Sequence, residues 1–223
     1  MDRGLALLAV AIAFGFLTAG FDKARYWVTT DPTSSGFLSW YYPRMFTYEN
    51  PQALAGLVPG TPLGVLKLAD LAAVVVESAG FVALLAGRMP WRAWLLVVTG
   101  LHLANALVLN ITFTTQAVIY LAFADLVLLA RPGLARWRLP AVGAVLVVGA
   151  WHVVTRVAGG GSGYFLWDGG RSAYAYDVYL CVVVCLGVMV LLALDVLREA
   201  RHLVTAVSAR RPSRRGAARA TSV

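Results

Sequence analysis

The sequence predicts an all-α fold, a polytopic bundle of helices embedded in a membrane. Of its 223 residues, 60% are hydrophobic and only 13% are charged, a composition typical of chains that cross a bilayer several times. The apolar residues form long runs, and a helix of about 20 apolar residues spans the hydrocarbon core. The formal net charge of +8 concentrates in the arginine-rich segment 198–223, which indicates membrane topology and not nucleic-acid binding.

Six segments have the composition of membrane helices, and residues 1–197 are expected to form one transmembrane domain. The first segment carries no charge, and no cleavage site of small residues follows it, so we interpret it as a membrane helix and not as a signal peptide. Residues 198–223 are expected to form a disordered, cytoplasmic tail. The expected spans are 5–21, 63–87, 94–110, 112–130, 141–157 and 176–197.

Two segments between the spans, 22–62 and 158–175, are rich in aromatic residues, proline and glycine. Such segments are too apolar for flexible linkers. We expect 22–62 to lie at the membrane interface or to fold down as a cap, with Trp27 and Trp40 at the level of the headgroups. The other interpretation of these aromatic residues is a lid over a cavity.

The basic residues outside the spans predict the orientation of the chain. With six spans both termini lie on one side, together with Arg3, with Arg88 and Arg92 after the second span, and with the basic loop 131–140. The positive-inside rule places this side in the cytoplasm of a multi-pass cell-membrane protein. The two aromatic segments then share the outer face.

The second span carries three ionisable residues, Lys67, Asp70 and Glu77. Their offsets of three and ten residues place them on one side of a helix. A charge at mid-membrane costs about 2.5–3.5 kcal/mol on insertion scales, so these groups are expected to face the protein interior or a wet cavity. Lys67 and Asp70 are close enough to neutralise each other in part, whereas Glu77 has no local partner.

Further polar residues lie in the other spans, with His102 and Asn105 three residues apart on one face of the third. A carboxylate and histidines away from water suit acid–base chemistry near neutral pH. We expect Glu77 to be the acid or proton-relay group, with His102 as its partner and Asn105 as a hydrogen-bonding orienter. Asp70 is expected to be a further catalytic residue. The expected substrate-binding residues are Trp27, Trp40, Tyr120, His152, Trp167 and Asp177.

The polar residues have two other interpretations. The polar side chains are also suited to hydrogen bonds between packed membrane helices. A metal site of Glu77, His102, His152 and Asp177 lacks the ligand spacing of known sites, so no metal is expected. No cofactor is expected either, because the glycine-rich residues 159–163 lack the lysine of a phosphate-binding loop. Cys181 and Cys185 are interpreted as buried packing residues.

Two stretches of the chain resemble known membrane families. Residues 76–98, with Glu77 and Gly80 followed by Gly87 and Arg88, resemble the second helix of DoxX-like membrane proteins. Residues 101–125 are similar to the HTTM family, the membrane domain related to the vitamin K-dependent γ-carboxylase. The matching residues there are Asn110, Tyr120 and Asp125.

The resemblance covers roughly residues 5–131 and implies a four-helix core with two added helices and an outward-opening cavity. It implies quinone-like or otherwise lipophilic ligands. The turn at 110–112 has no lysine nearby, unlike the carboxylase, so peptide carboxylation is not expected.

Together these observations predict a membrane enzyme that acts on an isoprenoid- or quinone-type molecule by acid–base chemistry. Proton-initiated terpenoid cyclisation and quinone-linked oxidoreduction are the two concrete versions. A non-catalytic subunit of a membrane redox or biosynthetic complex and a small proton-coupled transporter are the alternatives. The expected partners are the bilayer, a lipophilic small molecule and another membrane protein, with no nucleic acid.

Overall fold

The computed structural model describes residues 3–31, 33–48, 54–124 and 171–209, and within them every regular element is a helix. The all-α class predicted from the sequence is therefore confirmed for these residues. In chain order the elements are α1 (Arg3–Tyr26), α2 (Gly36–Tyr48), η1 (Ala55–Leu57), α3 (Leu63–Ser78), α4 (Gly80–Ala86), α5 (Arg88–Leu109), α6 (Thr114–Tyr120), η2 (Leu121–Phe123) and α9 (Arg171–Ala209).

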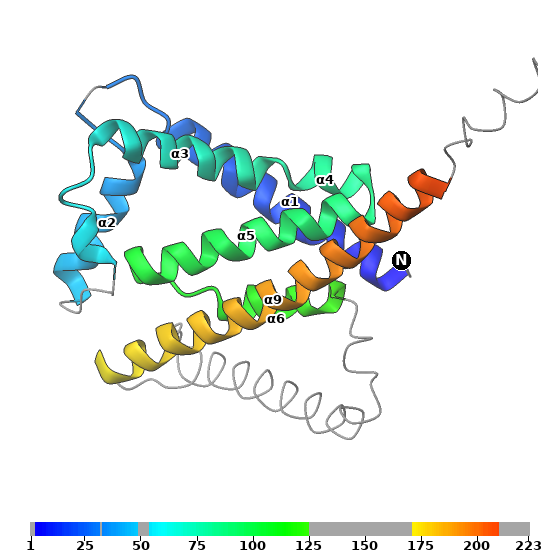
Figure 1. Cartoon of the computed structure of the whole chain (residues 1–223). Helices are drawn as coiled ribbons and strands as arrows, with labels where there is room; N and C mark the ends of the chain where they lie inside the picture. Colours follow the sequence, from blue (N-terminus) through cyan, green and yellow to red (C-terminus); the bar gives the residue numbers. More distant parts are fainter. Residues whose placement is uncertain (1–2, 32, 49–53, 125–170, 210–223) are drawn as a thin grey trace, which may run out of the picture.

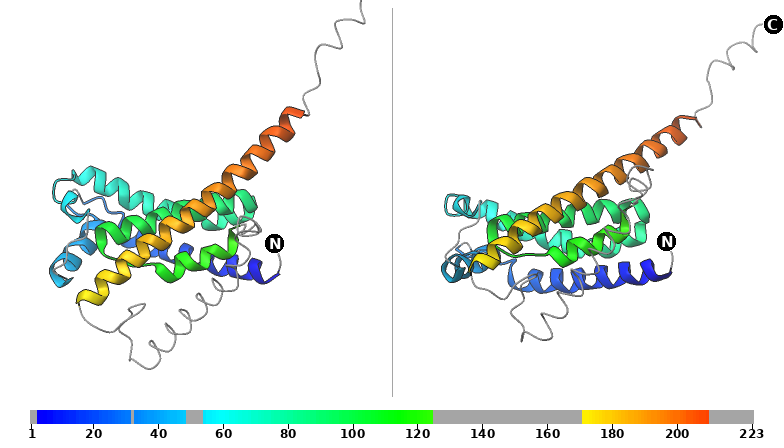
Figure 2. Two further views of the ribbon diagram at one scale, coloured as in Figure 1. Left: turned by 60° about the horizontal axis from the view of Figure 1, so that its bottom comes forward. Right: turned by 90° about the horizontal axis from the view of Figure 1, so that it is seen from below.

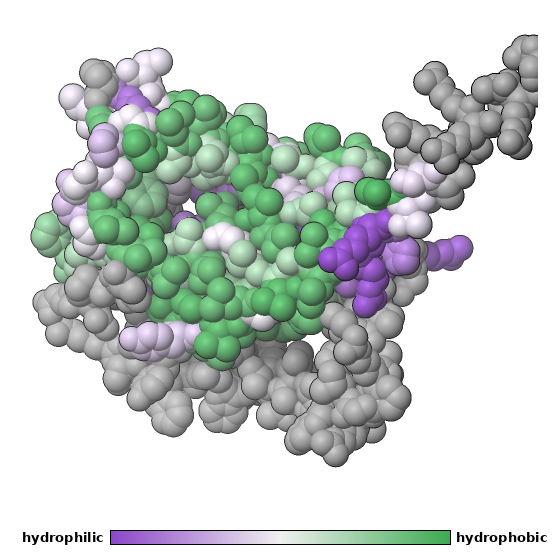
Figure 3. Space-filling model, viewed as in Figure 1, coloured by the Kyte–Doolittle hydropathy of each residue, from purple (hydrophilic) through white to green (hydrophobic). Residues whose placement is uncertain are grey.

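Helix α5 runs through the middle of the bundle and is the most buried of the long helices (Figure 1). Helices α1, α3 and α4 pack together on one side of it, and α9 and α6 pack on the other. Three helices, α1, α5 and α9, are long and apolar enough to cross a membrane, and the bent pair α3–α4 makes a fourth if it counts as one span. The described part of the face seen in Figure 3 is accordingly mostly apolar.

The expected spans agree with the helices at their centres and differ at their ends. The first lies within α1, and the second corresponds to α3 and α4. The third begins earlier than expected, at Arg88, and the sixth lies within α9, which continues to Ala209 through residues expected to form the tail. Of the fourth, the structure describes residues 112–124, which include α6 and η2, and the fifth lies outside the described residues.

The basic turn expected after the second span is the beginning of α5. Gly87 has a φ of 113°, which only glycine adopts readily, and it separates α4 from α5. Pro90 lies in the first turn of α5, where a missing N–H costs nothing. Arg92 is consequently on a helix and buried, and not in a basic loop. The helix ends at Asn110, which has the left-handed φ of 57°.

Helices α3 and α4 meet at a bend of 42° at Ala79. The Trp94 indole N–H of α5 donates to the Val76 carbonyl, 2.7 Å away, just before the bend. A methyl group on Gly80 would lie 2.6 Å from the Trp94 ring. The absence of a side chain at Gly80 therefore lets the bent helix lie against α5.

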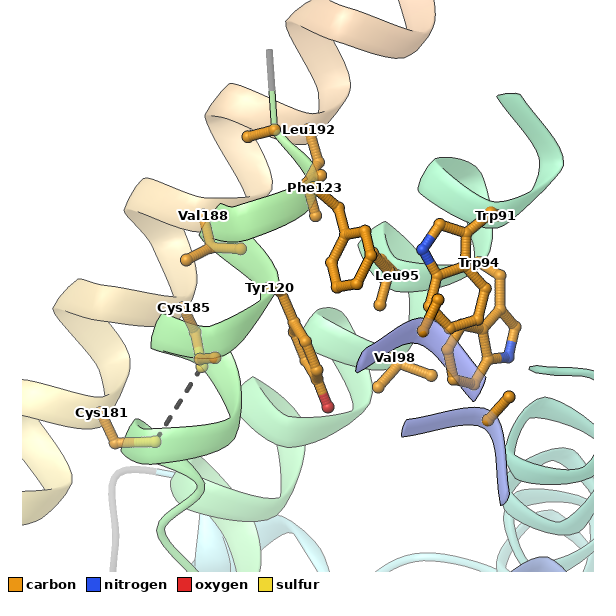
Figure 4. Packing of buried hydrophobic residues seen from close by; sticks show 14 of the residues in the cluster. Trp91, Trp94, Leu95, Val98, Tyr120, Phe123, Cys181, Cys185, Val188 and Leu192 are labelled. Atoms are coloured by element: carbon orange, nitrogen blue, oxygen red, sulfur yellow. Dashed lines mark hydrogen bonds between the residues drawn. The ribbon is translucent and has the colours of Figure 1, made fainter. Parts of the chain in front are cut away.

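The main core lies between α5, α6 and α9 and is closed on the other side by α1 (Figure 4). Trp91 and Trp94 stack at 4.9 Å between ring centroids, and the Phe123 ring meets Trp91 edge-on. Tyr120 points from α6 into this cluster, toward Val98 (Figure 4). Cys181 and Cys185 are both buried on α9 as free thiols, as the sequence predicts.

The aromatic segment after α1 contains a helix, α2, which lies across one end of the bundle (Figure 1). Asp70 of α3 holds this helix in place: its carboxylate accepts bonds from the Ser35 hydroxyl and from the amides of Gly36 and Phe37, at 2.7–3.0 Å. A carboxylate at a helix N-terminus satisfies free amides and complements the helix dipole.

The segment between α1 and α2 is tied to α3 by Lys67. Its ammonium donates to the carbonyls of Thr29 and Asp31, so Lys67 does not pair with Asp70 as the sequence suggested. Hydrogen bonds from the Thr33 amide and hydroxyl lower the pKa of the Asp31 carboxyl below its usual range. The segment therefore has a defined turn and a fixed position on α3.

Candidate functional site

An ion pair between Lys23 and Glu77 joins α1 to α3 inside the bundle. The Lys23 ammonium donates to Oε1 of Glu77, whose side chain is 5% exposed. The two helices come close here because α1 has glycine at position 20: a methyl group there would lie 2.6 Å from the Ser78 hydroxyl oxygen and 3.2 Å from Cβ of Glu77. Glu77, which has no partner nearby in sequence, thus has a partner from another helix.

His102 is positioned by aromatic residues from three elements. Its Nε2 lies 2.9 Å from the Tyr120 hydroxyl of α6. The imidazole stacks on the Phe113 ring, with centroids 4.1 Å apart and planes 15° apart, and Phe16 of α1 lies at 5.7 Å. His102 and Tyr120 are 2% and 1% exposed, so these contacts fix both rings in the interior.

The ion pair and the histidine line the same cavity, which has a volume of about 340 Å³. This volume is within the range of about 300–1,000 Å³ that small-molecule sites occupy. Most of its wall is apolar or aromatic, and the polar groups come from α1, α3, α5 and α6. The lining residues are Ala11, Ile12, Gly15, Phe16, Ala19, Lys23, Glu77, His102, Phe113, Gln116, Ile119 and Tyr120.

Among the residues that the structure describes, two buried polar atoms of this site have no hydrogen-bond partner, Oε2 of Glu77 and Nδ1 of His102. Buried polar atoms are nearly always hydrogen-bonded, and an exception needs an explanation. The Glu77 oxygen is an acceptor, and the histidine nitrogen donates or accepts according to its tautomer. A ligand hydroxyl in the cavity could donate to the Glu77 oxygen or pair with the histidine nitrogen, whereas a ligand carbonyl could only accept from protonated Nδ1 of His102.

The structure brings together three of the residues expected to form the site: Glu77, His102 and Tyr120 all line the cavity. Asp70 and Asn105, which were also expected in the site, do not line the cavity. Asp70 caps α2, and the Asn105 carbonyl accepts from the Ile111 amide at the end of α5. Asp70 is therefore better explained by a structural role than by the catalytic role expected for it.

Trp27 and Trp40 lie with α2 at the end of the bundle and do not line the cavity. Their ring centroids are 6.4 Å apart, and the Lys23 ammonium lies 5.0 Å from the Trp27 ring. His152 and Trp167 lie outside the described residues, as does the side chain of Asp177.

Three residues of the cavity, Lys23, Phe16 and Phe113, are not among those expected from the sequence. Lys23 follows the first apolar run and belongs to the segment 22–62 expected outside the spans. A helical period does connect it to the site, because Ile12, Phe16 and Lys23 are four and seven residues apart and face one side of α1. That pattern was the available signal. Phe113 lies in an irregular turn and carries no such signal.

Among the described residues, no group of three or more histidine, cysteine or acidic side chains has the arrangement to hold a metal ion. The polar side chains that line the cavity can form hydrogen bonds and exchange protons with a ligand.

Comparison of the chain with known proteins finds no matching family model, no matching curated protein and no matching solved structure.

Proposed function

We propose that this protein is an integral membrane enzyme that binds an isoprenoid- or quinone-type molecule and performs acid–base chemistry on its polar group. The observation that carries the proposal is the pair of unpartnered atoms, Oε2 of Glu77 and Nδ1 of His102, in one largely apolar cavity. A lipophilic body would contact the apolar wall, and the polar group would lie against these two atoms.

Of the two expected reaction types, the geometry favours proton exchange with a quinone or quinol group over cyclisation through a carbocation. A quinol hydroxyl would donate to Oε2 of Glu77, and a quinone carbonyl would accept from protonated Nδ1 of His102. Protonation of an alkene needs an acid aimed at the substrate, whereas Glu77 is an acceptor in its salt bridge. The Lys23 ammonium would also repel a carbocation.

The proposal includes a six-span topology with both termini in the cytoplasm. Helix α6 runs alongside α9, because the Phe113 amide bonds to Cys181 Sγ, and the Phe123 carbonyl bonds to Arg92, which pairs with Asp195. The end of η2, which follows α6, and the beginning of α9 therefore lie toward opposite ends of the bundle (Figure 1). One further crossing between them, the expected span 141–157, would connect the two ends.

The first test is native mass spectrometry with lipid extraction on the detergent-purified protein, with a short-chain isoprenoid quinone as added probe. We expect the wild-type chain to bind the probe, and Glu77→Gln to raise its Kd about tenfold, because a hydrogen bond to a charged group contributes ~1.5–3 kcal/mol. With an added two-electron donor, reduction of the bound quinone to the quinol takes up two protons, and its rate should fall about 10²–10⁴-fold in Glu77→Gln.

The matched controls are Asp22→Asn, an exposed carboxylate on α1, and Lys67→Met, a lysine bonded outside the cavity. Both should keep wild-type binding. Equal affinity in Glu77→Gln and wild type would refute the site. Binding without any conversion by the wild type would refute the enzyme and support the non-catalytic alternative.

A further inference from the structure

A second polar cluster lies at the other end of the bundle and is not part of the proposed site. Its centre is Arg92 of α5, which is 6% exposed. The Arg92 Nε–H donates to the Phe123 carbonyl at 2.8 Å, and its two terminal nitrogens lie 4.0 Å from Asp195 and 3.6 Å from Glu199 of α9. This network fixes α5 against α9 and η2.

Two cavities adjoin at this cluster, and Arg88 and Arg92 line both. The polar one has a volume of about 220 Å³ and lies between α5 and α9. The other, of about 450 Å³, is mainly apolar and reaches the beginning of α1 at Leu5. The polar cavity is lined by Arg88, Arg92, Asp195, Arg198, Glu199 and His202, and the larger one by Leu5, Leu84, Gly87, Arg88, Trp91, Arg92, Ala122, Phe123 and Ala124.

The charges of the polar cavity favour an anion. Three arginines face two carboxylates, which leaves one positive charge in excess among the described residues with the histidine neutral. Arg88 and Arg198 have exposed side chains, whereas Arg92 is buried beneath them. A phosphate group is recognised by arginine through paired, charge-assisted hydrogen bonds.

The depth of this cluster corresponds to the headgroup region of a bilayer. The cluster forms the most hydrophilic part of the surface at the end of the apolar bundle (Figure 3). It also lies at the first residue of α5, a candidate membrane span. Basic pockets between membrane helices at this level bind phospholipid headgroups.

We infer that Arg88, Arg92 and Arg198 bind the phosphate of an anionic phospholipid, with one acyl chain in the adjoining apolar cavity. The polar cavity supplies the charge, and the neighbouring 450 Å³ supplies the apolar volume that a free phosphate ion would leave empty. This inference is independent of the function proposed for the Glu77 cavity, with which the two cavities share no residue.

The test is native mass spectrometry of the full chain released from nanodiscs that contain equal amounts of phosphatidylglycerol and phosphatidylcholine. We expect one phosphatidylglycerol per chain to be retained. In Arg88→Gln and in Arg198→Gln the apparent affinity should fall about fivefold, as expected for one basic group at a membrane surface. Ala122→Leu, which fills the apolar cavity, should lower retention while all charges stay in place.

Arg201→Gln is the matched control, because Arg201 is an exposed arginine on the same helix, three residues beyond Arg198, and does not line either cavity. It should retain phosphatidylglycerol at the wild-type level. Equal losses in Arg201→Gln and Arg198→Gln, or no selective retention by the wild type, would overturn the inference. Complete displacement by millimolar glycerol 3-phosphate, with no effect of Ala122→Leu, would identify a free-phosphate site and overturn the lipid.

Thermal unfolding of each variant separates a lost ligand from a lost fold. Arg88 and Arg198 are exposed, so their variants should unfold within a few degrees of the wild type in lipid-free detergent. Added phosphatidylglycerol should raise the unfolding temperature of the wild type and of Arg201→Gln more than that of Arg88→Gln or Arg198→Gln.

Discussion

At the scale of single residues, the central feature is an ion pair that joins two helices, with a buried carboxylate and a partly exposed ammonium. A buried carboxylate such as that of Glu77 costs several kcal/mol without a partner, and Lys23 supplies that partner. The pair also leaves Oε2 of Glu77 without a partner. The same carboxylate therefore serves structure through one oxygen and is available for a ligand through the other.

This arrangement predicts strong coupling between the two residues. Lys23→Met alone should lower the free energy of unfolding by about 3–5 kcal/mol, because it leaves the buried Glu77 carboxylate unpaired. Glu77→Met alone should cost less, because the Lys23 side chain is 23% exposed and its ammonium can be hydrated. The double variant should recover most of that loss while remaining unable to bind the probe. Unfolding in a denaturing detergent measures the three values. Strictly additive losses would show that the two side chains do not interact.

Glu77, His102 and Tyr120 could be predicted from the sequence, because polar side chains within apolar helices are conspicuous. The contact of Asp70 with the N-terminus of α2 could not be predicted, because it joins residues more than 30 positions apart and depends on a helix within an aromatic segment. Lys23 was missed because the end of α1 extends beyond its apolar run.

At the scale of elements, the bend between α3 and α4 places Glu77 just before a break in its helix. The break is supported by Trp94, whose indole bonds to the Val76 carbonyl and whose ring fills the space beside Gly80. Two contacts from α5 therefore determine how the second span approaches the cavity.

Trp94→Phe should lower the free energy of unfolding by about 0.5–1.5 kcal/mol for the lost hydrogen bond, with a further loss from the space left by the smaller ring. The variant should also weaken probe binding, because Glu77 lies next to the bend. Trp40→Phe, at a tryptophan 44% exposed on α2, is the control for thermal unfolding. Equal effects of both substitutions would contradict a role for Trp94 at the bend.

The spans expected from the sequence agree with the helices of the structure best in the apolar centres and least at the ends. An apolar run marks where a helix lies in the membrane, but α5 begins with Arg88 and α9 continues through charged residues to Ala209. A helix propagates wherever its backbone bonds are satisfied, whether or not the side chains are apolar. Hydropathy alone therefore underestimates the length of both helices.

At the scale of the whole molecule, the order of the helices places the beginning of α1 and the end of α9 at the same end of the bundle (Figure 2). The arginine cluster lies at this end as well, and α2 lies at the opposite one. One end of the bundle therefore carries the arginine cluster together with the beginning of α1 and the end of α9, and the other end carries α2.

Single cysteines test this arrangement in intact cells with a membrane-impermeant maleimide. A cysteine at Thr33, exposed next to α2, should react from outside the cell, and one at Ser208 should react only after the membrane is opened. The native Cys181 and Cys185 are buried and serve as the unreactive background. Labelling of Ser208→Cys in intact cells would reverse the orientation proposed here.

The length of α9 has a practical consequence for imaging. With 39 residues it measures about 58 Å at 1.5 Å per residue, roughly twice the thickness of a hydrocarbon core, and its last turns project beyond the bundle (Figure 2). A chain of 223 residues offers few features for particle alignment in cryo-electron microscopy. A helical fiducial domain joined in register at Ala209 would continue this helix without a flexible joint and would report the orientation of the bundle inside its micelle.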